Sequence, residues 1–311
     1  MLSIVVPVYR NESCIPNLLK AIEFLHEKLN GQMEVLFIVD GSPDCSYALL
    51  RAALPEKLFQ SQLILLSKNF GSFQAIRVGL QLGNGDRFAV LAADLQEPPE
   101  LVLEIDSTLR KGDVDVVVGV RDSRKDPLLS RIPAQFFWWL YRRYVVPEIP
   151  PGGVDVFGCN RHFRDTLLQL DERHSSLIAQ IFWLGFRRKC VSYIRQSRQY
   201  GKSAWTLHRK INYLMDSVFS FTDLPIRLLT RIGGIGVVLA GLLGSAAVTA
   251  KFLGMVVVPG YTITILTIIF FGALNLLGLG IVGSYAWRSY ENTKARPLAI
   301  VLKSEKFTSQ V

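Results

Sequence analysis

Cysteine and histidine are scarce in this sequence of 311 residues, and neither is clustered. The four cysteines lie far apart and form no CxxC pair: Cys14, Cys45, Cys159 and Cys190. This spacing argues against a zinc module and gives no support to a disulfide framework, so we expect free thiols in a reducing compartment. The four histidines share no metal-ligand spacing either.

Charged residues are also few, at 20% of the chain against 50% hydrophobic residues. That balance is too apolar for an ordinary soluble protein and too polar for one that lies wholly within a bilayer. Most of the shortage falls within residues 232–287, which hold almost no charge. We therefore predict a globular part followed by a membrane part. The first residues, MLSIVVPVYRNE, have no basic segment and only a short apolar run, so we expect no signal peptide.

Two uncharged runs, 232–250 and 262–287, make up the predicted membrane part. At helical rise the first would be ~28 Å long, close to the hydrocarbon thickness of a bilayer. The short connection around Pro259 predicts a hairpin of two transmembrane helices, about 232–258 and 262–287. A buried pair of helices in a soluble core is the alternative. Gly236, Ala240 and Gly244 form a small-residue face that suits helix packing or subunit contact, hence a possible homo-oligomer.

Basic residues flank this hairpin on its outer ends, whereas the connecting loop offers only Lys251. The flanking residues are Arg209, Lys210, Arg227, Arg231, Arg288, Lys294, Arg296, Lys303 and Lys306. The positive-inside rule then predicts a multi-pass membrane protein with the globular part and both termini in the cytoplasm.

The net charge of +9 calls for an anionic partner. Nucleic acid is one candidate, but no nucleic-acid-binding motif is present. Anionic lipid headgroups and diphosphate-bearing substrates are the others. Apolar residues at helical spacing over 207–221 predict an amphipathic helix, either on the membrane surface or against the globular core.

The globular part alternates predicted strands with predicted helices. Short β-branched runs predict strands at 2–8, 34–39, 62–66, 87–92 and 114–118, and apolar periodicity predicts helices at 15–30, 72–82 and 99–111. This alternation predicts an α/β fold with a mainly parallel sheet and helices on both faces. Ligands bind beyond the carboxyl ends of such strands, where this sequence has polar and glycine-containing segments.

Four of these segments, in order, resemble the motifs of family 2 glycosyltransferases: 7–12 (PVYRNE), 39–44 (VDGSPD), 69–71 (NFG) and 93–99 (ADLQEPP). The resemblance is strongest to the polyprenyl-phosphate branch, which includes dolichyl-phosphate mannose synthases and bactoprenol glucosyltransferases. It continues through 155–161, 198–203, 280–285 and 294–297, and so covers nearly the whole chain.

The resemblance implies a GT-A, Rossmann-like domain that transfers a sugar with inversion. Its organisation would be a GT-A domain at 1–202, juxtamembrane amphipathic helices at 203–230, the hairpin at 231–288 and a cytoplasmic tail at 289–311. It further implies a nucleotide-sugar site made of Pro7, Tyr9, Glu12, Asp40, Lys68, Asp94 and Gln96. For Pro7 and Tyr9, packing at the strand end is the alternative.

The leaving nucleoside diphosphate needs a cation, which the resemblance implies is Mg²⁺ or Mn²⁺ on Asp94 and Gln96. The family pattern Asp-x-Asp-x-Gln is incomplete here, because Ala92 replaces the first acid. The family's Asp-Asp-Gly-Ser is likewise reduced to Asp40-Gly41-Ser42. Mg²⁺ is often held by one or two carboxylates together with phosphate and water, so Asp94 and Gln96 with the diphosphate can suffice.

The acceptor would be a lipid phosphate, whose second pKa of about 6 leaves an oxygen anionic at neutral pH. A strong base is then unnecessary, and Asp155 would orient the acceptor or balance charge; capping of a loop is its alternative role. Cations that would offset phosphate repulsion are Arg121, Arg161, Arg198 and Lys202.

These features predict transfer of a hexose from a nucleotide-sugar, expected to be a UDP-sugar, to undecaprenyl or dolichyl phosphate for cell-envelope glycan or glycosylation. A processive polysaccharide synthase is one alternative, but its Gln-x-x-Arg-Trp motif is missing. A catalytically impaired nucleotide-sugar-binding or scaffold protein is the other, and the two missing acids favour it.

Overall fold

The computed structural model describes residues 1–121, 139, 141–143, 146–150, 153–172, 175–196, 207–253 and 260–308. The chain divides into two units, which are described separately. The first comprises Met1–Tyr213 and Arg296–Val311, and the second comprises Leu214–Ala295.

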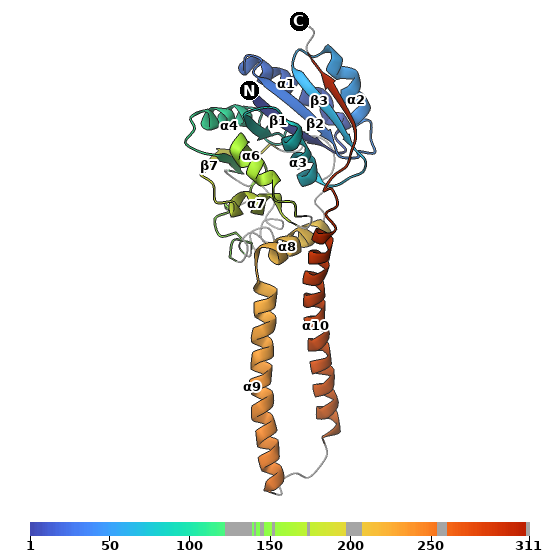
Figure 1. The fold of residues 1–311 in the computed structure, drawn as a ribbon, viewed down its shortest axis with the longest axis vertical. Helices are drawn as coiled ribbons and strands as arrows, with labels where there is room; N and C mark the ends of the chain where they lie inside the picture. Colours follow the sequence, from blue (N-terminus) through green and yellow to red (C-terminus); the bar gives the residue numbers. More distant parts are fainter. Residues whose placement is uncertain are drawn as a thin grey trace. The chain divides into compact units, whose positions relative to one another are not determined.

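A mainly parallel sheet forms the first unit (Figure 1). Within the described residues it has eight strands in the order β7-β5-β6-β4-β1-β2-β3-β8. Their bounds are β1 Leu2–Val8, β2 Met33–Val39, β3 Gln60–Leu66, β4 Arg87–Val90, β5 Val116–Arg121, β6 Phe157–Asn160, β7 Arg188–Tyr193 and β8 Val301–Phe307. β6 runs antiparallel to β4 and β5, and β8 runs antiparallel to β3. The predicted α/β class and the first five strands are confirmed to within a few residues, whereas the two antiparallel strands were not predicted.

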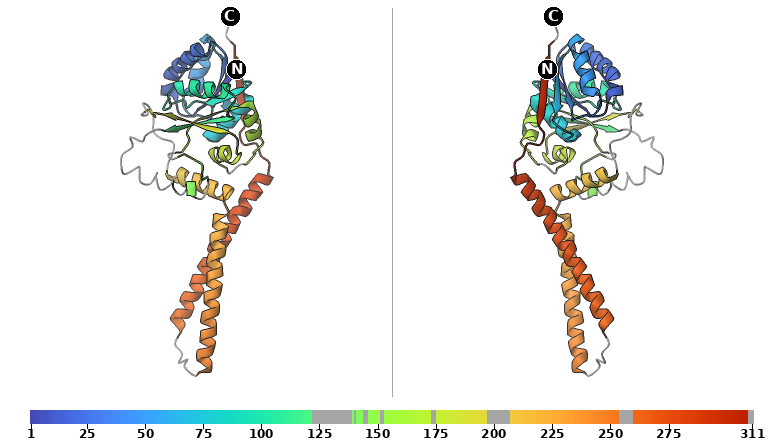
Figure 2. Two further views of the ribbon diagram at one scale, coloured as in Figure 1. Left: turned by 90° about the vertical axis from the view of Figure 1, so that its left-hand side faces the viewer. Right: turned by 90° about the vertical axis from the view of Figure 1, so that its right-hand side faces the viewer.

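Helices cover both faces of this sheet, as predicted (Figure 2). Their bounds in the first unit are α1 Ile15–Lys28, α2 Ser46–Ala53, α3 Ser72–Leu82, α4 Glu100–Arg110, α6 Arg161–Leu168 and α7 Leu177–Trp183, with short 3₁₀ turns at Glu12–Cys14 and Leu54–Glu56. Alternate residues of β1, such as Ile4 and Val6, share one core cluster with α1 and α4. Val5 points to the other face, where a Cβ at Gly79 of α3 would lie 2.3 Å from it. Because both faces are covered, the strands read as continuous apolar runs rather than alternating ones.

The C-terminal segment adds the last strand of the sheet. β8 pairs with β3 from Ser61↔Phe307 to Leu66↔Val301. Tyr47 Oη of α2 donates to Glu305 of β8 at 2.6 Å, and Arg51 Nε donates to the other carboxylate oxygen at 2.9 Å. Residues 301–307, which the sequence predicts as part of a tail, are thus an edge strand of the sheet.

The second unit is helical, with α9 at Leu224–Phe252 and α10 at Tyr261–Thr293. Figure 1 shows these two helices running in opposite directions. Among the described residues, one helical stretch, Phe270–Thr293, is long and apolar enough to cross a membrane. This stretch overlaps the second predicted span, 262–287, whereas the first, 232–258, is not identified as a candidate; residues 254–259 lie outside the described residues.

The predicted amphipathic helix corresponds to α8, Leu207–Phe221. On its described turns the stripe residue Val218 is buried, and Leu214 and Phe221 are half-buried. Within the second unit, α8 contacts the end of α10. Arg288 donates to Asp216 at 2.8 Å and its guanidinium lies 5.1 Å from the ring of Phe219.

Candidate active site

Asp40 follows β2 and holds the loop that follows β3. Its side chain is buried, and its two carboxylate oxygens accept from the backbone N–H groups of Phe70, at 2.7 Å, and Gly71, at 2.8 Å. Gly41 has a φ of +54°, and a Cβ there would lie 2.2 Å from the backbone of Lys68. Only glycine therefore allows the two loops to approach this closely. The predicted nucleotide ligand Asp40 is thus also an organiser of the neighbouring loop.

Asp44 joins the loops that follow β1 and β2. Its carboxylate accepts from the hydroxyl groups of Ser42 and Ser46 and from the backbone N–H of Glu12 at 3.1 Å. In return, Glu12 accepts from the backbone N–H of Cys45 at 3.0 Å. Partial burial alone would raise the pKa of Asp44, but the hydrogen bonds outweigh burial and lower that pKa below its ordinary value. The predicted ligand Glu12 is therefore held in place by the loop of Asp40.

The remaining predicted nucleotide ligands of this region lie at or just beyond the ends of β1 and β3. Pro7, opposite Ile38 of β2, and Tyr9 are half-buried at the end of β1. Lys68 is exposed after β3, with its ammonium 5.2 Å from the centre of the Phe70 ring. Since β1, β2 and β3 are adjacent and parallel, Pro7, Tyr9, Glu12, Asp40 and Lys68 share one edge of the sheet.

A second group of polar residues surrounds Asp155, which precedes β6. Arg121, the last residue of β5, donates from Nε and Nη2 to the two carboxylate oxygens of Asp155. Tyr193, the last residue of β7, donates its hydroxyl to Asp155 at 2.7 Å. β6 runs antiparallel to β5, so the start of β6 lies beside the end of β5. β7 is the other neighbour of β5 and runs parallel to it, so the end of β7 lies on the same side.

The ionisation of this trio follows from its bonds. Burial alone would raise the pKa of Asp155, but Arg121 and Tyr193 outweigh it and hold the pKa below its ordinary value. Burial would lower the pKa of Arg121, yet the adjacent Asp155 raises it overall. Burial and the same carboxylate raise the pKa of Tyr193. The trio is therefore an ionised carboxylate held by a cation and a neutral phenol.

Asp94 and Gln96 lie in the turn that follows β4, where Leu95 has a φ of +51°. Asp94 is half-buried and accepts from the backbone N–H of Gln96 at 3.4 Å. The side-chain oxygen of Gln96 accepts from Arg195, and its backbone oxygen accepts from the N–H of Gln196 at 2.9 Å. The segment after β7 is thereby joined to the predicted metal-binding turn.

Glu97 completes this second group, and it is only 3% exposed. Its Oε2 has no hydrogen-bond partner among the described residues. Burial, together with the negative charges of Asp155 and Asp94, raises the pKa of Glu97 to about 7, while Arg195 partly opposes the shift. Three carboxylates therefore influence one another at this edge of the sheet.

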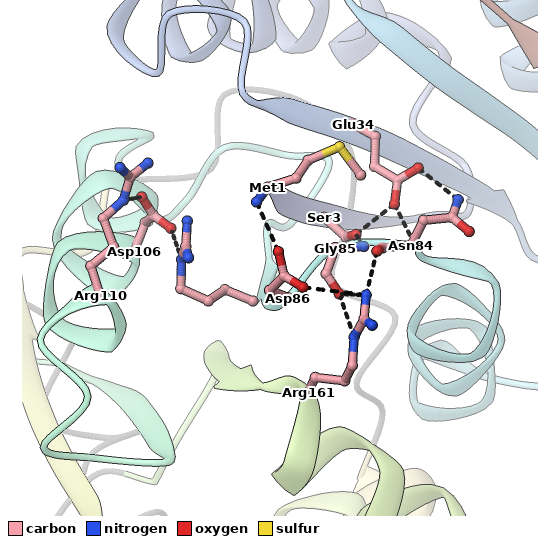
Figure 3. Close-up of polar contacts among 10 residues, drawn as sticks. Met1, Ser3, Glu34, Asn84, Gly85, Asp86, Asp106, Arg110 and Arg161 are labelled. Carbon is pink, nitrogen blue, oxygen red and sulfur yellow. Dashed lines mark hydrogen bonds and ion pairs between the residues drawn. The ribbon is translucent and has the colours of Figure 1, made fainter.

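Arg161, predicted to bind phosphate, does not join either group. It donates to the backbone oxygens of Asn84, at 2.7 Å, and Gly85, and pairs with Asp86 at 3.4 Å (Figure 3). Asp155 precedes β6 and Arg161 follows it, so the two lie at opposite ends of that strand, ~20 Å apart at extended rise. In this structure Arg161 holds the segment 84–86, which leads into β4. The other predicted cations, Arg198 and Lys202, lie outside the described residues.

The residues at the second group partly fit a divalent cation. In the part of the chain that the structure describes, no three His, Cys, Asp or Glu side chains are grouped to hold a metal. Asp94 and the unpartnered oxygen of Glu97 are nevertheless the hard oxygen donors that Mg²⁺ and Mn²⁺ take. A cation here would need further oxygens from a bound diphosphate or water.

Sequence reasoning missed three residues of this group: Glu97, Tyr193 and Arg195. Glu97 lies within the predicted motif 93–99, but its burial, which sets it apart, is visible only in the fold. Tyr193 and Arg195 follow β7, a strand that the sequence did not predict, so nothing in the pattern placed them beside Asp155.

Comparisons with known proteins place this geometry in context. The model of the family described as Glycosyl transferase family 2 matches residues 3–170. An uncharacterized glycosyltransferase of Synechocystis sp. is 31% identical over 96% of this chain and 94% of its own length. An undecaprenyl-phosphate 4-deoxy-4-formamido-L-arabinose transferase of Pseudomonas paraeruginosa is 31% identical, over 96% and 88%. A prophage bactoprenol glucosyl transferase homolog of Escherichia coli is 28% identical, over 98% and 99%.

Solved structures show more distant similarity. A mannosyltransferase of Pyrobaculum calidifontis, solved with GDP-mannose and Mn²⁺, is 16% identical and covers 92% of this chain and 87% of its own, with a TM-score of 0.45.

Proposed function

Because the chain belongs to glycosyl transferase family 2, we propose that it moves a hexose, with inversion, from a nucleotide-sugar to a polyprenyl phosphate. The donor would be a UDP-sugar, and the acceptor undecaprenyl or dolichyl phosphate. Two of the similar proteins are named for transfer to undecaprenyl phosphate or bactoprenol, which supports this acceptor class. The product would serve cell-envelope glycan synthesis or glycosylation.

The observation that carries the proposal is the convergence of two polar groups on one edge of the sheet. Pro7, Tyr9, Glu12, Asp40 and Lys68 gather at the ends of β1 to β3, where the base and ribose of the donor would bind. Asp94, Gln96 and Asp155, with Arg121 and Arg195, gather at the ends of β4 to β7. β1 and β4 are neighbours, so a nucleotide-sugar could extend from the first group to the second.

Asp155 would act by holding Arg121 rather than by accepting a proton. Both of its oxygens are bonded and its lowered pKa makes it a weak base. Since a lipid phosphate already has an anionic oxygen at neutral pH, it can attack the anomeric carbon without a base. The guanidinium of Arg121 would then offset the charge of the phosphates that meet there.

Mg²⁺ or Mn²⁺, when bound at Asp94, would neutralise charge on the departing nucleoside diphosphate. Asp94 would hold the cation, and Arg195 and Gln96 would fix the turn that carries Asp94.

We further propose that α9 and α10 both span the membrane, with the catalytic domain and both termini in the cytoplasm. The candidate span Phe270–Thr293 and the length of α9 support it. A small-residue face in α9 would suit a homo-oligomer.

The decisive experiment incubates the full chain in detergent with undecaprenyl phosphate, a panel of nucleotide-sugars and Mg²⁺ or Mn²⁺, and measures released nucleoside diphosphate. Release that needs both the lipid and one particular donor supports the proposal and identifies the sugar. Binding of a donor without release from any member of the panel favours the alternative, a membrane-bound nucleotide-sugar-binding or scaffold protein. The residues that favour that alternative are Val39 and Ala92, which replace acids of the family pattern.

A further inference from the structure

Glu97 lies inside the candidate site without a bonding partner for one of its oxygens. Its side chain is 3% exposed, and Oε2 has no hydrogen-bond partner in the described part of the chain. A buried carboxylate oxygen without a donor loses its hydration and gains nothing in return, which costs stability. Such an atom at a binding site therefore needs a partner that the protein itself does not supply.

The charges around Glu97 indicate a positive partner. Asp94 and Asp155 both lie close enough to act on Glu97 electrostatically. Neither arginine of this group is hydrogen-bonded to Oε2 of Glu97: Arg121 pairs with Asp155, and Arg195 donates from Nη2 to Gln96, while its buried Nε has no hydrogen-bond partner among the described residues. Arg195 acts on Glu97 through its charge alone, so negative charge remains in excess at this position.

The alternative donors in this turn are less suited to a cation than Glu97. The side-chain oxygen of Gln96 already accepts from the guanidinium of Arg195, and a cation there would have to approach a second positive group. Ala92 has no side-chain oxygen that could bind a cation. Glu97 offers an oxygen without a hydrogen-bond partner among the described residues, close in sequence to Asp94.

We propose that Glu97 is a ligand of the divalent cation, which it shares with Asp94 and with the diphosphate of the bound nucleotide. The inference rests on the proposed function, because the nucleotide supplies the remaining oxygens. Two carboxylates with phosphate and water are an ordinary set for Mg²⁺ or Mn²⁺. This arrangement also agrees with the lack of a preformed three-residue metal group among the described residues.

The test measures retention of Mn²⁺ by the full chain in detergent, from the electron paramagnetic resonance signal of the free ion, with UDP or GDP present. Glu97→Gln keeps the shape of the side chain and removes its charge. Glu100→Gln is the matched control, because Glu100 is an exposed glutamate three residues further along. We expect Glu97→Gln to weaken nucleotide-dependent Mn²⁺ binding at least about tenfold, and Glu100→Gln to leave it unchanged.

A second measurement separates loss of the ligand from loss of the fold. Without cation, Glu97→Gln should unfold at a temperature no lower than the unmodified chain, since it removes a buried, unpartnered charge. Mn²⁺ with nucleotide should then raise that temperature in the unmodified chain and not in Glu97→Gln. If Glu97→Gln does not fold, Glu97→Asp, which retains the charge on a shorter side chain, should show intermediate Mn²⁺ affinity.

Mn²⁺ affinity that is equal in Glu97→Gln and Glu100→Gln would overturn the inference. If Glu97→Gln also still transfers sugar in a cation-dependent way, the proposed function stands although Glu97 is not a ligand. Mn²⁺ binding that depends on Glu97, in a protein that transfers nothing to lipid phosphate, would uphold the cation site and refute the proposed function.

Discussion

Arg121 bonds to both carboxylate oxygens of Asp155, although the two residues are 34 positions apart: Arg121 ends β5 and Asp155 precedes β6, the antiparallel neighbour of β5. The sequence predicts one of them as a phosphate ligand and the other as a catalytic carboxylate. In the structure they are one unit, completed by the hydroxyl of Tyr193. A change to any of the three should therefore affect the other two.

Tyr193→Phe removes one of the bonds that hold Asp155. We expect turnover in the lipid-phosphate assay to fall roughly tenfold, because a hydrogen bond to a charged group is worth about 1.5–3 kcal/mol. Tyr47→Phe is the matched control, since it deletes a tyrosine hydroxyl bonded to Glu305, outside the candidate site. Equal turnover in the two variants would show that Tyr193 does not position Asp155.

Asp94→Ala should abolish cation-dependent transfer, because it removes the half-buried carboxylate at the end of β4. The measurement is release of nucleoside diphosphate at increasing Mn²⁺ concentration. Asp113→Ala, at an exposed aspartate, provides the control. Unchanged turnover in Asp94→Ala would remove Asp94 from the mechanism.

Asp44 should make the stability of the first unit depend on pH in the acid range. Its pKa is lowered in the folded chain, so it stabilises the fold above its unfolded pKa of about 3.9, and this contribution is lost as the pH falls toward the folded value. Thermal unfolding of the full chain should therefore show a larger loss between roughly pH 5 and 3 than unfolding of Asp44→Asn. Asp113→Asn should retain the full loss, and an identical profile for Asp44→Asn would contradict the assignment.

Removal of β8 should destabilise the first unit for two reasons. It leaves the edge of β3 unpaired, and it deletes the hydrogen bonds of Tyr47 and Arg51 to Glu305. We expect a chain ended after residue 297 to unfold at a clearly lower temperature. A chain ended after residue 307 keeps the whole strand and should behave as the full chain. The exposed ion pair contributes little on its own, so Arg51→Ala should leave the unfolding temperature almost unchanged.

Reporter tags fused to the two termini should both be found in the cytoplasm. The expectation follows from the basic residues that flank the predicted hairpin and from the single lysine in its loop. Protease protection in spheroplasts measures it. A tag on the outer side at either terminus would contradict the two-span arrangement.

Local pattern determined much of this protein. Continuous apolar runs predicted β1 to β5, because strands buried on both faces need apolar residues at every position. Helical periodicity predicted α1, α3 and α4, because a helix that packs against a sheet needs apolar residues only on the face that contacts it. The motif residues Pro7, Tyr9, Glu12, Asp40, Lys68, Asp94 and Gln96 lie at or beyond the ends of parallel strands, which bring them to one edge, so the first polar group and the turn of Asp94 could be predicted from sequence.

Tertiary structure decided the rest, because antiparallel strands and long-range bonds leave no local signal. β6 is only four residues long, and its reversed direction places Asp155 among the strand ends and Arg161 at the opposite end. The pairing of β8 with β3 joins residues more than 230 positions apart. Tyr193, Arg195 and the buried Glu97 acquire their meaning only from neighbours that the fold brings to them, since burial and charge at a site depend on what surrounds it in space.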